Sequence, residues 1–361
     1  MTGQALVACP ARTVKLVPRR DFLTGSVLGC AGFLASPCAW SQERKPEISS
    51  FDLSLLDEWL TPNSLFFVRD HFPAPTTSTD NWKLSVGGAL GSPYEIPYDD
   101  LLRQPRRTLA VTLECAENPA GGGLVSHAEW SGVSVAGLLA KAQPQPEAGY
   151  VRMRGTDGYS RTIPMAKALH PDTLLALTMN GDRLPAAHGF PVRAVVPGWY
   201  GMDSVKWLQT IEVLHREEDV TQAYRRVLSR VGGNRDAGPV AAMEVKSVFA
   251  RPADGAILLG RRFMVRGAAW AGERKVGTVE VSTDGGSSWE AARFSPLGPP
   301  AARAYAWAHW EYDWKIRGPG SYELACRATD ESGRVQPARR PAERVDDYEL
   351  NTWQIVRVSA I

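Results

Sequence analysis

Residues 109–123 read LAVTLECAENPAGGG, and this stretch decides how the chain is interpreted. The run 109–113 is apolar and partly β-branched, which is typical of a strand, and the glycines at 121–123 indicate a loop after it. Cys115 lies between the two. A thiol at a strand end beside a glycine-rich loop is well placed to bind a metal, because the thiolate is the ligating form. A small buried apolar side chain is the alternative, since free cysteine often packs in cores.

The length and charge of the chain limit the classes of protein it can belong to. At 361 residues it is too long for one ordinary core, so two domains are expected. The formal net charge is +2, and residues 1–41 hold four basic residues and one acidic residue, which leaves the remainder near −1. No basic face is indicated, so nucleic acid is not an expected partner.

The N-terminus has the features of an export signal. Arg19 and Arg20 precede Phe22-Leu23, and the apolar stretch 27–35 is too short to span a bilayer. Paired arginines followed by Phe-Leu resemble a twin-arginine signal, which exports folded proteins. We expect residues 1–41 to be removed and the mature chain to be periplasmic, with no stable membrane insertion. An ordinary secretion signal and a lipoprotein signal with a lipidated Cys30 are the alternatives.

Removal of this leader would take three of the five cysteines with it and leave Cys115 and Cys326. Two cysteines in an exported protein can in principle form a disulfide. If Cys115 binds a metal they cannot pair, and the protein must be stable without disulfides.

The segment 65–213 alternates strand-like and helix-like patterns, which predicts a mixed α/β domain. Short helices are predicted at 52–60, from residue 97, and at 133–141, the last with Ser131 or Gly132 near its cap. Strands are predicted at 82–86, 150–154, 190–196 and 205–213.

The glycine-rich and proline-containing stretch 232–239 reads as a domain boundary. Beyond it the pattern is all-β, and Asp284-Gly285 predicts a hairpin, because Asp-Gly supplies the positive φ of a tight turn. Short strands at this spacing predict a β-sandwich. The expected fold class is therefore α+β, with a leader at 1–41, a mixed α/β domain at 42–235 and a sandwich at 240–361. Strands of the sandwich are expected at 263–267, 279–282, 305–314, 322–328 and 352–358.

Four segments of the first domain are rich in groups that bind anions: 63–73, the Cys115 loop, 154–158 and 188–207. Taken singly, the candidates have ordinary explanations. Arg69 could form a surface ion pair, Lys206 could be a solvated strand residue and His188 a turn residue. Taken together, the segments offer fixed cations and glycine-lined backbone, which is what a phosphate-bearing cofactor needs.

These segments resemble the sulfite oxidase family of molybdopterin enzymes. The motifs are RDHFP at 69–73, LECAEN at 113–118, HGFPVR at 188–193, and PG at 197–198 followed by SVKW at 204–207. The resemblance covers roughly residues 50–215. It continues more weakly into the C-terminal segment, which resembles the family's immunoglobulin-like dimerisation domain.

The resemblance implies a role for each matching residue. Cys115 would be the thiolate ligand of molybdenum, beside the two dithiolene sulfurs of a single pyranopterin, the molybdopterin. Arg69 would bind an oxyanion substrate with its planar guanidinium. Trp130 would form a pocket wall, and Tyr224 is a poorer match to the family's active-site tyrosine. The pterin and its phosphate would be held by His71, Asp157, His188, Arg193, Ser204 and Lys206.

Three positions depart from the family's pattern. Glu117 stands where glycine is usual, Ala223 replaces an acid before the tyrosine, and an arginine that helps to bind sulfite is absent after Asn118. A Glu117 carboxylate that faced the pocket would repel a dianion by about 4 kcal/mol at ~4 Å and an effective dielectric near 20. These departures concern the substrate rather than the fold or the cofactor.

The resemblance implies a molybdopterin-dependent oxidoreductase that oxidises sulfite or a related small sulfur oxyanion by oxygen-atom transfer. No Cys-x-x-Cys-His haem motif occurs, so electrons are expected to pass to a separate c-type cytochrome. A homodimer is expected from the C-terminal resemblance. The alternatives are a sulfane-dehydrogenase-like member, a sulfoxide-reducing member, which the C-terminal sandwich disfavours, and a non-catalytic binding protein that retains the fold.

Overall fold

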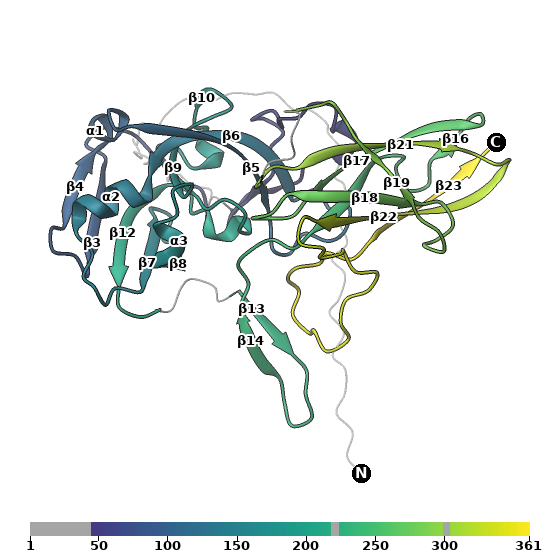
Figure 1. The fold of residues 1–361 in the computed structure, drawn as a ribbon. Helices are drawn as coiled ribbons and strands as arrows, with labels where there is room; N and C mark the ends of the chain where they lie inside the picture. The colour runs from purple at the N-terminus through teal and green to yellow at the C-terminus, as the bar shows by residue number, and fades with distance from the viewer. Residues whose placement is uncertain (1–44, 218–223, 299–303) are drawn as a thin grey trace, which may run out of the picture. The chain divides into compact units, whose positions relative to one another are not determined.

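The structure is a computed structural model, and it describes residues 45–217, 224–298 and 304–361. The expected leader at 1–41 and Ala223 lie outside these residues. Within the described ranges, two five-stranded sheets with short helices precede a two-sheet sandwich (Figure 1). The α+β fold class is therefore confirmed. No helix in the described part of the chain combines the length and apolar character needed to cross a membrane.

The first sheet carries the Cys115 loop. Its strand order is β10-β9-β6-β5, and β11 also pairs with β9. Every residue of β5 pairs with β6, from Arg106 opposite Val133 to Glu114 opposite Val125. Residues 115–124 are therefore the loop of a long antiparallel hairpin. The strands are β5 (Arg106–Glu114), β6 (Val125–Ser134), β9 (Leu174–Met179), β10 (Asp182–Arg183) and β11 (Arg193–Val195).

The second sheet has the order β4-β3-β12-β7-β8, and only its β12–β3 pair is parallel. Its buried side chains share a core with β9 and with the helix α2. The strands are β3 (Lys83–Gly88), β4 (Tyr94–Pro97), β7 (Tyr150–Gly155), β8 (Ser160–Pro164) and β12 (Leu208–Leu214). The helices are α1 (Tyr98–Leu102), α2 (Val135–Ala142) and α3 (Met165–Ala168).

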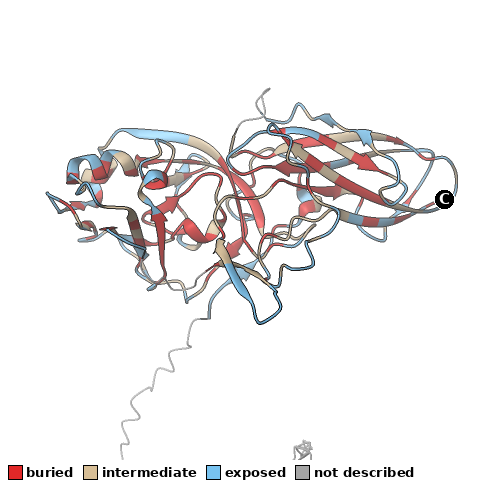
Figure 2. Ribbon diagram, turned by 60° about the horizontal axis from the view of Figure 1, so that its bottom comes forward, coloured by how far each residue is buried: buried red, intermediate tan, exposed pale blue. Residues whose placement is uncertain are grey.

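Beyond residue 245 two sheets enclose a separate core, seen as buried faces turned toward each other in Figure 2. The first sheet contains β15 (Lys246–Arg251), β17 (Arg262–Trp270), β20 (Arg293–Phe294) and β21 (Ala308–Lys315). The second contains β16 (Ile257–Leu258), β18 (Val276–Ser282), β19 (Glu290–Ala291), β22 (Gly320–Asp330) and β23 (Gln354–Ala360). The hairpin predicted around Asp284-Gly285 is confirmed, because it joins β18 to β19.

Short elements connect these layers. Two-stranded sheets are formed by β1 (Ile48–Ser49) with β2 (Val68–Arg69) and by β13 (Arg225–Leu228) with β14 (Arg235–Pro239). Single 3-10 turns are η1 (Leu53–Leu55), η2 (Ala186–His188) and η3 (Gly201–Asp203). Gly232 and Gly233, which the sequence indicated as part of a domain boundary, lie in the turn between β13 and β14. Glycine-rich turn chemistry is the same whether a turn joins two domains or two strands, so the sequence did not distinguish these cases.

Several local predictions were wrong for physical reasons. The helix expected at 52–60 is only the turn η1, because Phe51, Leu53 and Leu56 pack into a core with residues distant in sequence, which overrides helix propensity. The helix expected at 133–141 begins at Val135, and its cap residue is Ser134, because β6 continues to that point.

The two strands expected near the fourth anion-binding segment are also shorter than predicted. The strand at 190–196 is reduced to β11, and the strand at 205–213 begins at Leu208. Trp207 has a φ of 50°, which strand geometry does not accommodate. The strands β6, β8 and β9 were not predicted.

Two histidines are buried where the first sheet meets the sandwich. His127 of β6 and His309 of β21 both lie against the ring of Trp307, and neither Nε2 atom has a hydrogen-bond partner among the described residues. Burial lowers the pKa of His127 to about 3 and that of His309 to about 4. Both rings are therefore neutral in the folded protein at neutral pH.

We expect the free energy of unfolding to fall as the pH drops from 7 to 5. Below a pH of about 6.5 the unfolded histidines take up protons that the folded ones do not, which costs about 1.4 kcal/mol per pH unit for each histidine. Urea unfolding at both pH values measures the loss. The His127→Gln/His309→Gln variant should show a flatter dependence, and an unchanged slope would contradict the assignment.

Candidate functional site

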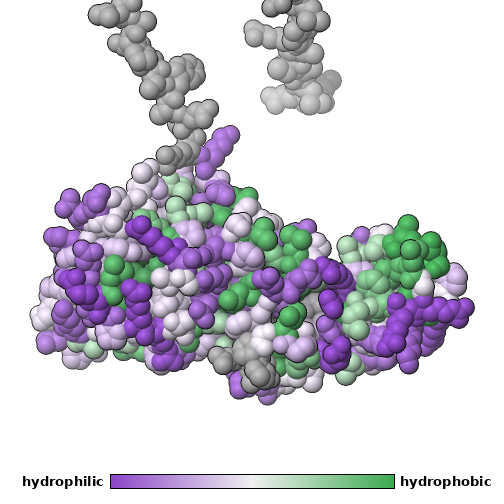
Figure 3. Space-filling model, turned by 90° about the horizontal axis from the view of Figure 1, so that it is seen from above, coloured by the Kyte–Doolittle hydropathy of each residue, from purple (hydrophilic) through white to green (hydrophobic). Residues whose placement is uncertain are grey.

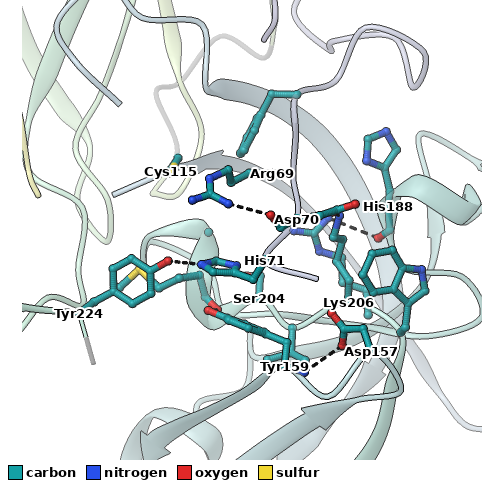
Figure 4. A pocket seen from close by; sticks show the side chains of 16 residues that line it. Arg69, Asp70, His71, Cys115, Asp157, Tyr159, His188, Ser204, Lys206 and Tyr224 are labelled. Carbon is teal, nitrogen blue, oxygen red and sulfur yellow. Dashed lines mark hydrogen bonds and ion pairs between the residues drawn. The ribbon is translucent and has the colours of Figure 1, made fainter. Parts of the chain in front are cut away.

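A pocket opens at the end of the β5–β6 hairpin (Figure 4). It encloses about 630 Å³ of space, a volume that includes open solvent. Loops, β2, η2, β11, η3 and the residue that precedes β13 supply its walls. Its lining residues are Phe67, Arg69, Asp70, His71, Cys115, Asp157, Tyr159, His188, Arg193, Gly201, Met202, Ser204, Val205, Lys206, Trp207 and Tyr224.

Cys115 is placed by backbone hydrogen bonds of the hairpin loop. Its N–H donates to the carbonyl of Leu124 at 2.9 Å, and its carbonyl accepts from the N–H of Asn118 at 3.0 Å. Burial raises the pKa of the Cys115 thiol to about 11, and the carboxylate of Glu117 adds to this, while Arg69 opposes it. The free chain therefore holds a thiol at neutral pH, and a metal would have to displace its proton.

Arg69 lies at the end of β2, beside the Cys115 loop. Its Nη1 donates to the carbonyl of Asp70 at 2.7 Å, and its Nη2 lies 3.4 Å from Oε2 of Glu117. The two side chains are 23% and 34% exposed, so solvent screens the pair. The guanidinium expected to bind substrate is thus already in contact with a carboxylate of the chain itself.

Arg193 is the deeply buried cation of the pocket. Its Nη1 donates to the carbonyl of His188 at 3.4 Å, and its Nε atom has no hydrogen-bond partner. Its guanidinium lies over the ring of Trp130 at 5.1 Å from the centroid. Burial lowers the pKa of Arg193 to about 10, so the charge persists at neutral pH. Within the described residues no hydrogen bond or ion pair links this cation to a carboxylate, and the attraction of the nearby Asp70 offsets only part of the effect of burial.

Lys206 is a second buried cation that lines the pocket, and it also has hydrogen-bond partners within the chain. Its Nζ donates to Oδ1 of Asp70 and, at 3.0 Å, to the carbonyl of Ala187. Burial lowers the pKa of Lys206 to about 8, and Asp70 opposes that shift. Gly189 has a φ of 108°, and a Cβ there would lie 3.0 Å from Cα of Lys206, so glycine allows the His188 turn to approach this lysine.

Three further polar side chains of the pocket are hydrogen-bonded to the backbone. Nε2 of His188 is 2.9 Å from the carbonyl of Asn63, and burial lowers the pKa of this histidine to about 4. Ser204 accepts from the N–H of Val196 at 3.1 Å. Asp157 accepts from the N–H of Tyr159 at 3.1 Å, and burial raises its pKa.

Tyr224 joins the pocket through His71. The hydroxyl of Tyr224 lies 2.5 Å from Nε2 of His71, whose ring stacks on Tyr159 at 4.5 Å between centroids. Behind it, the guanidinium of Arg161 lies 5.2 Å from the centroid of the Tyr224 ring and is paired with Asp203. Burial raises the pKa of Tyr224 strongly, so its hydroxyl keeps its proton.

The structure brings most of the predicted site residues into one pocket. Trp130 does not line it, since its fully buried ring lies behind Arg193. Glu117 is not a lining residue either, but its carboxylate contacts Arg69 and raises the pKa of Cys115. Sequence reasoning missed Asp70 and Tyr159. Each had a signal, because Asp70 stands between two predicted residues and Tyr159 follows Asp157 by two. The residues brought together as predicted are Arg69, His71, Cys115, Asp157, His188, Arg193, Ser204, Lys206 and Tyr224.

The pocket fits an anionic group. Arg193 presents a buried charge that no hydrogen bond or ion pair links to a carboxylate within the described residues, and only the nearby Asp70 favours that charge. Lys206 lies near Arg193, whose charge helps to lower the pKa of the lysine. Leaving such a cation buried is unfavourable unless a counter-charge arrives. A phosphate would supply that charge and accept from both donors. The thiol of Cys115 lies in the same pocket, so one ligand with a phosphate and a soft metal suits the residues present.

The chain matches two known domain families. Residues 71–222 match the oxidoreductase molybdopterin binding domain, and residues 238–360 match the Mo-co oxidoreductase dimerisation domain.

Proteins with similar sequences and structures agree with these matches. Sulfite oxidase of Gallus gallus is 35% identical over 317 residues, covering 78% of this chain and 69% of that protein. Mitochondrial sulfite oxidase of Homo sapiens is 32% identical over 340 residues, covering 84% of this chain and 62% of that protein. The chain thus spans about two thirds of the length of these relatives. The sulfane dehydrogenase SoxCD from Paracoccus pantotrophus superposes with a TM-score of 0.77 at 28% identity, covering 89% of this chain and 90% of that one.

Replacing Arg193 separates binding from stability. We expect Arg193→Met to unfold at an equal or higher urea concentration in the cofactor-free chain, because the burial of this charge outweighs its attraction to Asp70. The same variant should retain at least tenfold less molybdenum and pterin than the wild type, measured by metal analysis and pterin fluorescence.

Arg161→Met is the matched control, because that guanidinium is paired with Asp203. It should destabilise the chain by about 3–5 kcal/mol, since it leaves a buried carboxylate unpaired. If Arg193→Met lost as much stability as this control, the charge of Arg193 would be satisfied within the protein.

Proposed function

Because the chain belongs to the sulfite oxidase family of molybdopterin-dependent oxidoreductases, we propose that it oxidises sulfite or a related small sulfur oxyanion. The observation that carries the proposal is the placement of Cys115, Arg69 and Arg193 around one pocket. In the balanced reaction, sulfite and water give sulfate, two protons and two electrons. Two one-electron acceptors take the electrons.

The residues that would hold the cofactor follow from the pocket. Cys115 would ligate molybdenum, and Arg193 and Lys206 would bind the phosphate, with His71, Asp157, His188 and Ser204 around the pterin. When bound, the cofactor supplies the oxygen-atom transfer and stores two electrons. The chain orients it through fixed donors, and water is kept from much of it by the buried walls.

Arg69 and Tyr224 are the side chains placed to meet a substrate. Arg69 would bind an oxyanion with its guanidinium fork, as the planar geometry favours. The hydroxyl of Tyr224, held by His71, would donate to a substrate oxygen, because its raised pKa keeps it protonated. Binding by such preorganised donors stabilises developing negative charge.

A second substrate class is favoured by Glu117. Its carboxylate contacts Arg69, so a dianion would have to displace an internal partner and approach a negative charge. A sulfane sulfur, carried by a larger neutral or singly charged molecule, meets less repulsion. The structural likeness to sulfane dehydrogenase SoxCD supports considering this class.

The test is steady-state reduction of ferricyanide or a c-type cytochrome by the purified, molybdenum-loaded chain. Sulfite and glutathione persulfide are compared as electron donors, and Cys115→Ser is the control. We expect about one molybdenum per wild-type chain, donor-dependent reduction by the wild type, and at least a hundredfold loss in Cys115→Ser. A fully loaded wild type that oxidises neither donor would favour a non-catalytic binding protein.

Glu117→Gln tests the charge argument. We expect KM for sulfite to fall about tenfold with little change in kcat, which is about 1.4 kcal/mol of removed repulsion, modest because the group is partly exposed. The effect should shrink at high salt. Glu95→Gln is the matched control, since its carboxylate pairs with Lys83 on the surface. An unchanged or higher KM for sulfite would mean that Glu117 does not oppose the substrate.

We also propose a homodimer, a separate c-type cytochrome as acceptor, and export to the periplasm by the twin-arginine pathway. The dimer is supported by the domain match at 238–360 and by exposed apolar side chains at the end of the sandwich, Ile257, Leu259 and Ile361 (Figure 3). Sedimentation equilibrium measures the proposed dimer, and a stable monomer at micromolar concentration would contradict it.

Reduction of the cytochrome in the assay above tests the acceptor. Fractionation of cells that produce the Arg19→Lys/Arg20→Lys variant tests the export signal.

A further inference from the structure

A buried polar cluster flanks Cys115 and joins its loop to the C-terminal sandwich. Glu114 is the last residue of β5 and Asn118 lies in the loop, whereas Lys246 is the first residue of β15 and Trp270 the last residue of β17. None of these four residues is more than 1% exposed. Glu114 and Asn118 lie within the molybdopterin-binding match, whereas Lys246 and Trp270 lie within the dimerisation match.

The side-chain polar atoms of Glu114 and Lys246 all have partners within this cluster. Nζ of Lys246 donates to Oε1 of Glu114 and, at 2.9 Å, to the carbonyl of Asn118. The indole N–H of Trp270 donates to Oε2 of Glu114 at 2.8 Å. The side-chain amide of Asn118 donates to Oε1 of Glu114 at 3.1 Å. Lys246 thus bridges the residue before Cys115 and a residue three positions after it.

A further hydrogen bond attaches the loop to the C-terminal part of the chain. The N–H of Glu349 donates to the carbonyl of Ala116 at 2.8 Å. Oδ1 of Asn118 accepts from the N–H of Leu124 at 3.0 Å, which closes the loop across its base. The backbone around Cys115 is consequently attached to the sandwich through Lys246 and Trp270 and, separately, through Glu349.

We propose that Lys246 is a positioning residue for the Cys115 thiol, and that the C-terminal domain completes the metal-ligand loop in addition to its match to a dimerisation domain. Lys246 touches neither the pocket nor the thiol, so it acts through the two loop groups that it bridges. A break in a buried pair leaves an uncompensated charge, which is strongly unfavourable. Without the lysine, Glu114 would be left buried and unpaired, and the loop would shift to relieve this cost. The direction of the thiol would change with the loop.

The first experiment uses the full chain without cofactor and compares Lys246→Met with the wild type. Hydrogen exchange, followed by mass spectrometry of the peptide that contains Cys115, reports the protection of the loop amides. We expect that peptide to exchange at least tenfold faster in Lys246→Met. Exchange at the wild-type rate in a folded variant would overturn the proposal.

Lys167→Met is the matched control. Lys167 is also a buried lysine that reaches into the sandwich region, where its Nζ lies 2.5 Å from Oε1 of Glu273. Within the described residues, its Nζ donates to the carbonyl of Pro197 and to Glu273, and neither belongs to the Cys115 loop. We expect this variant to lose global stability while exchange in the Cys115 peptide stays at the wild-type rate. Equal acceleration in both variants would reduce Lys246 to a general stabilising role and overturn the proposal.

A spectroscopic readout separates positioning from stability. In the molybdenum-loaded proteins, the visible absorption band that arises from the cysteine sulfur bound to the metal should shift in Lys246→Met and not in Lys167→Met. An identical band in all three proteins would overturn the proposal. This outcome does not depend on which sulfur compound the enzyme oxidises, so it is distinct from failure of the proposed function.

Two further variants keep the test decisive if Lys246→Met does not fold. Trp270→Phe removes one hydrogen bond to Glu114 and leaves the ion pair in place, so a two- to threefold acceleration of loop exchange is expected. The Lys246→Met/Glu114→Gln variant removes both charges and should recover global stability. Its loop should still exchange faster than the wild type, because the bridge to the carbonyl of Asn118 is absent. Full recovery of loop protection in Lys246→Met/Glu114→Gln would show that only the unpaired charge mattered, which would overturn the proposal. Wild-type exchange of the Cys115 peptide in Trp270→Phe would also contradict it.

Discussion

The pairing of β5 with β6 is the constraint on which the site depends. Because every residue of β5 pairs with β6, the loop that follows has both ends fixed only a strand separation apart. Hydrogen bonds within the loop then set the backbone of Cys115. The sandwich adds a buried ion pair at the end of the hairpin, so groups from two folded layers meet beside the Cys115 loop.

The pocket contains two buried cations, and their burial lowers the stability of the chain when no cofactor is bound. Arg193 keeps its charge in a buried setting, with an aromatic ring and one carbonyl as its neighbours, while Lys206 shares its charge with Asp70. Burial disfavours both charges, which is why both pKa values are lowered. Such an arrangement is most favourable when an anion is present. The phosphate of a molybdopterin meets that requirement, in agreement with the family to which the chain belongs.

The substrate end of the pocket has the opposite character. Arg69 is partly exposed, and its guanidinium is balanced by Glu117 from the Cys115 loop. The deep half of the pocket is thus strongly anion-binding, and the mouth is close to neutral. A charge gradient of this kind retains a phosphate-bearing cofactor firmly and leaves selection of the substrate to a few kilocalories of repulsion and hydrogen bonding.

The sequence by itself determined the local features whose causes are local. The strand before Cys115 and the Asp-Gly hairpin were predicted, because propensity and turn chemistry act over a few residues. The ordered motifs identified the family and most of the pocket. Only the tertiary structure decided which charges are paired, since Lys246 meets Glu114 across 132 positions and Glu117 meets Arg69 across 48. Ion pairing depends on distance in space, and the spacing of residues along a chain does not contain that distance.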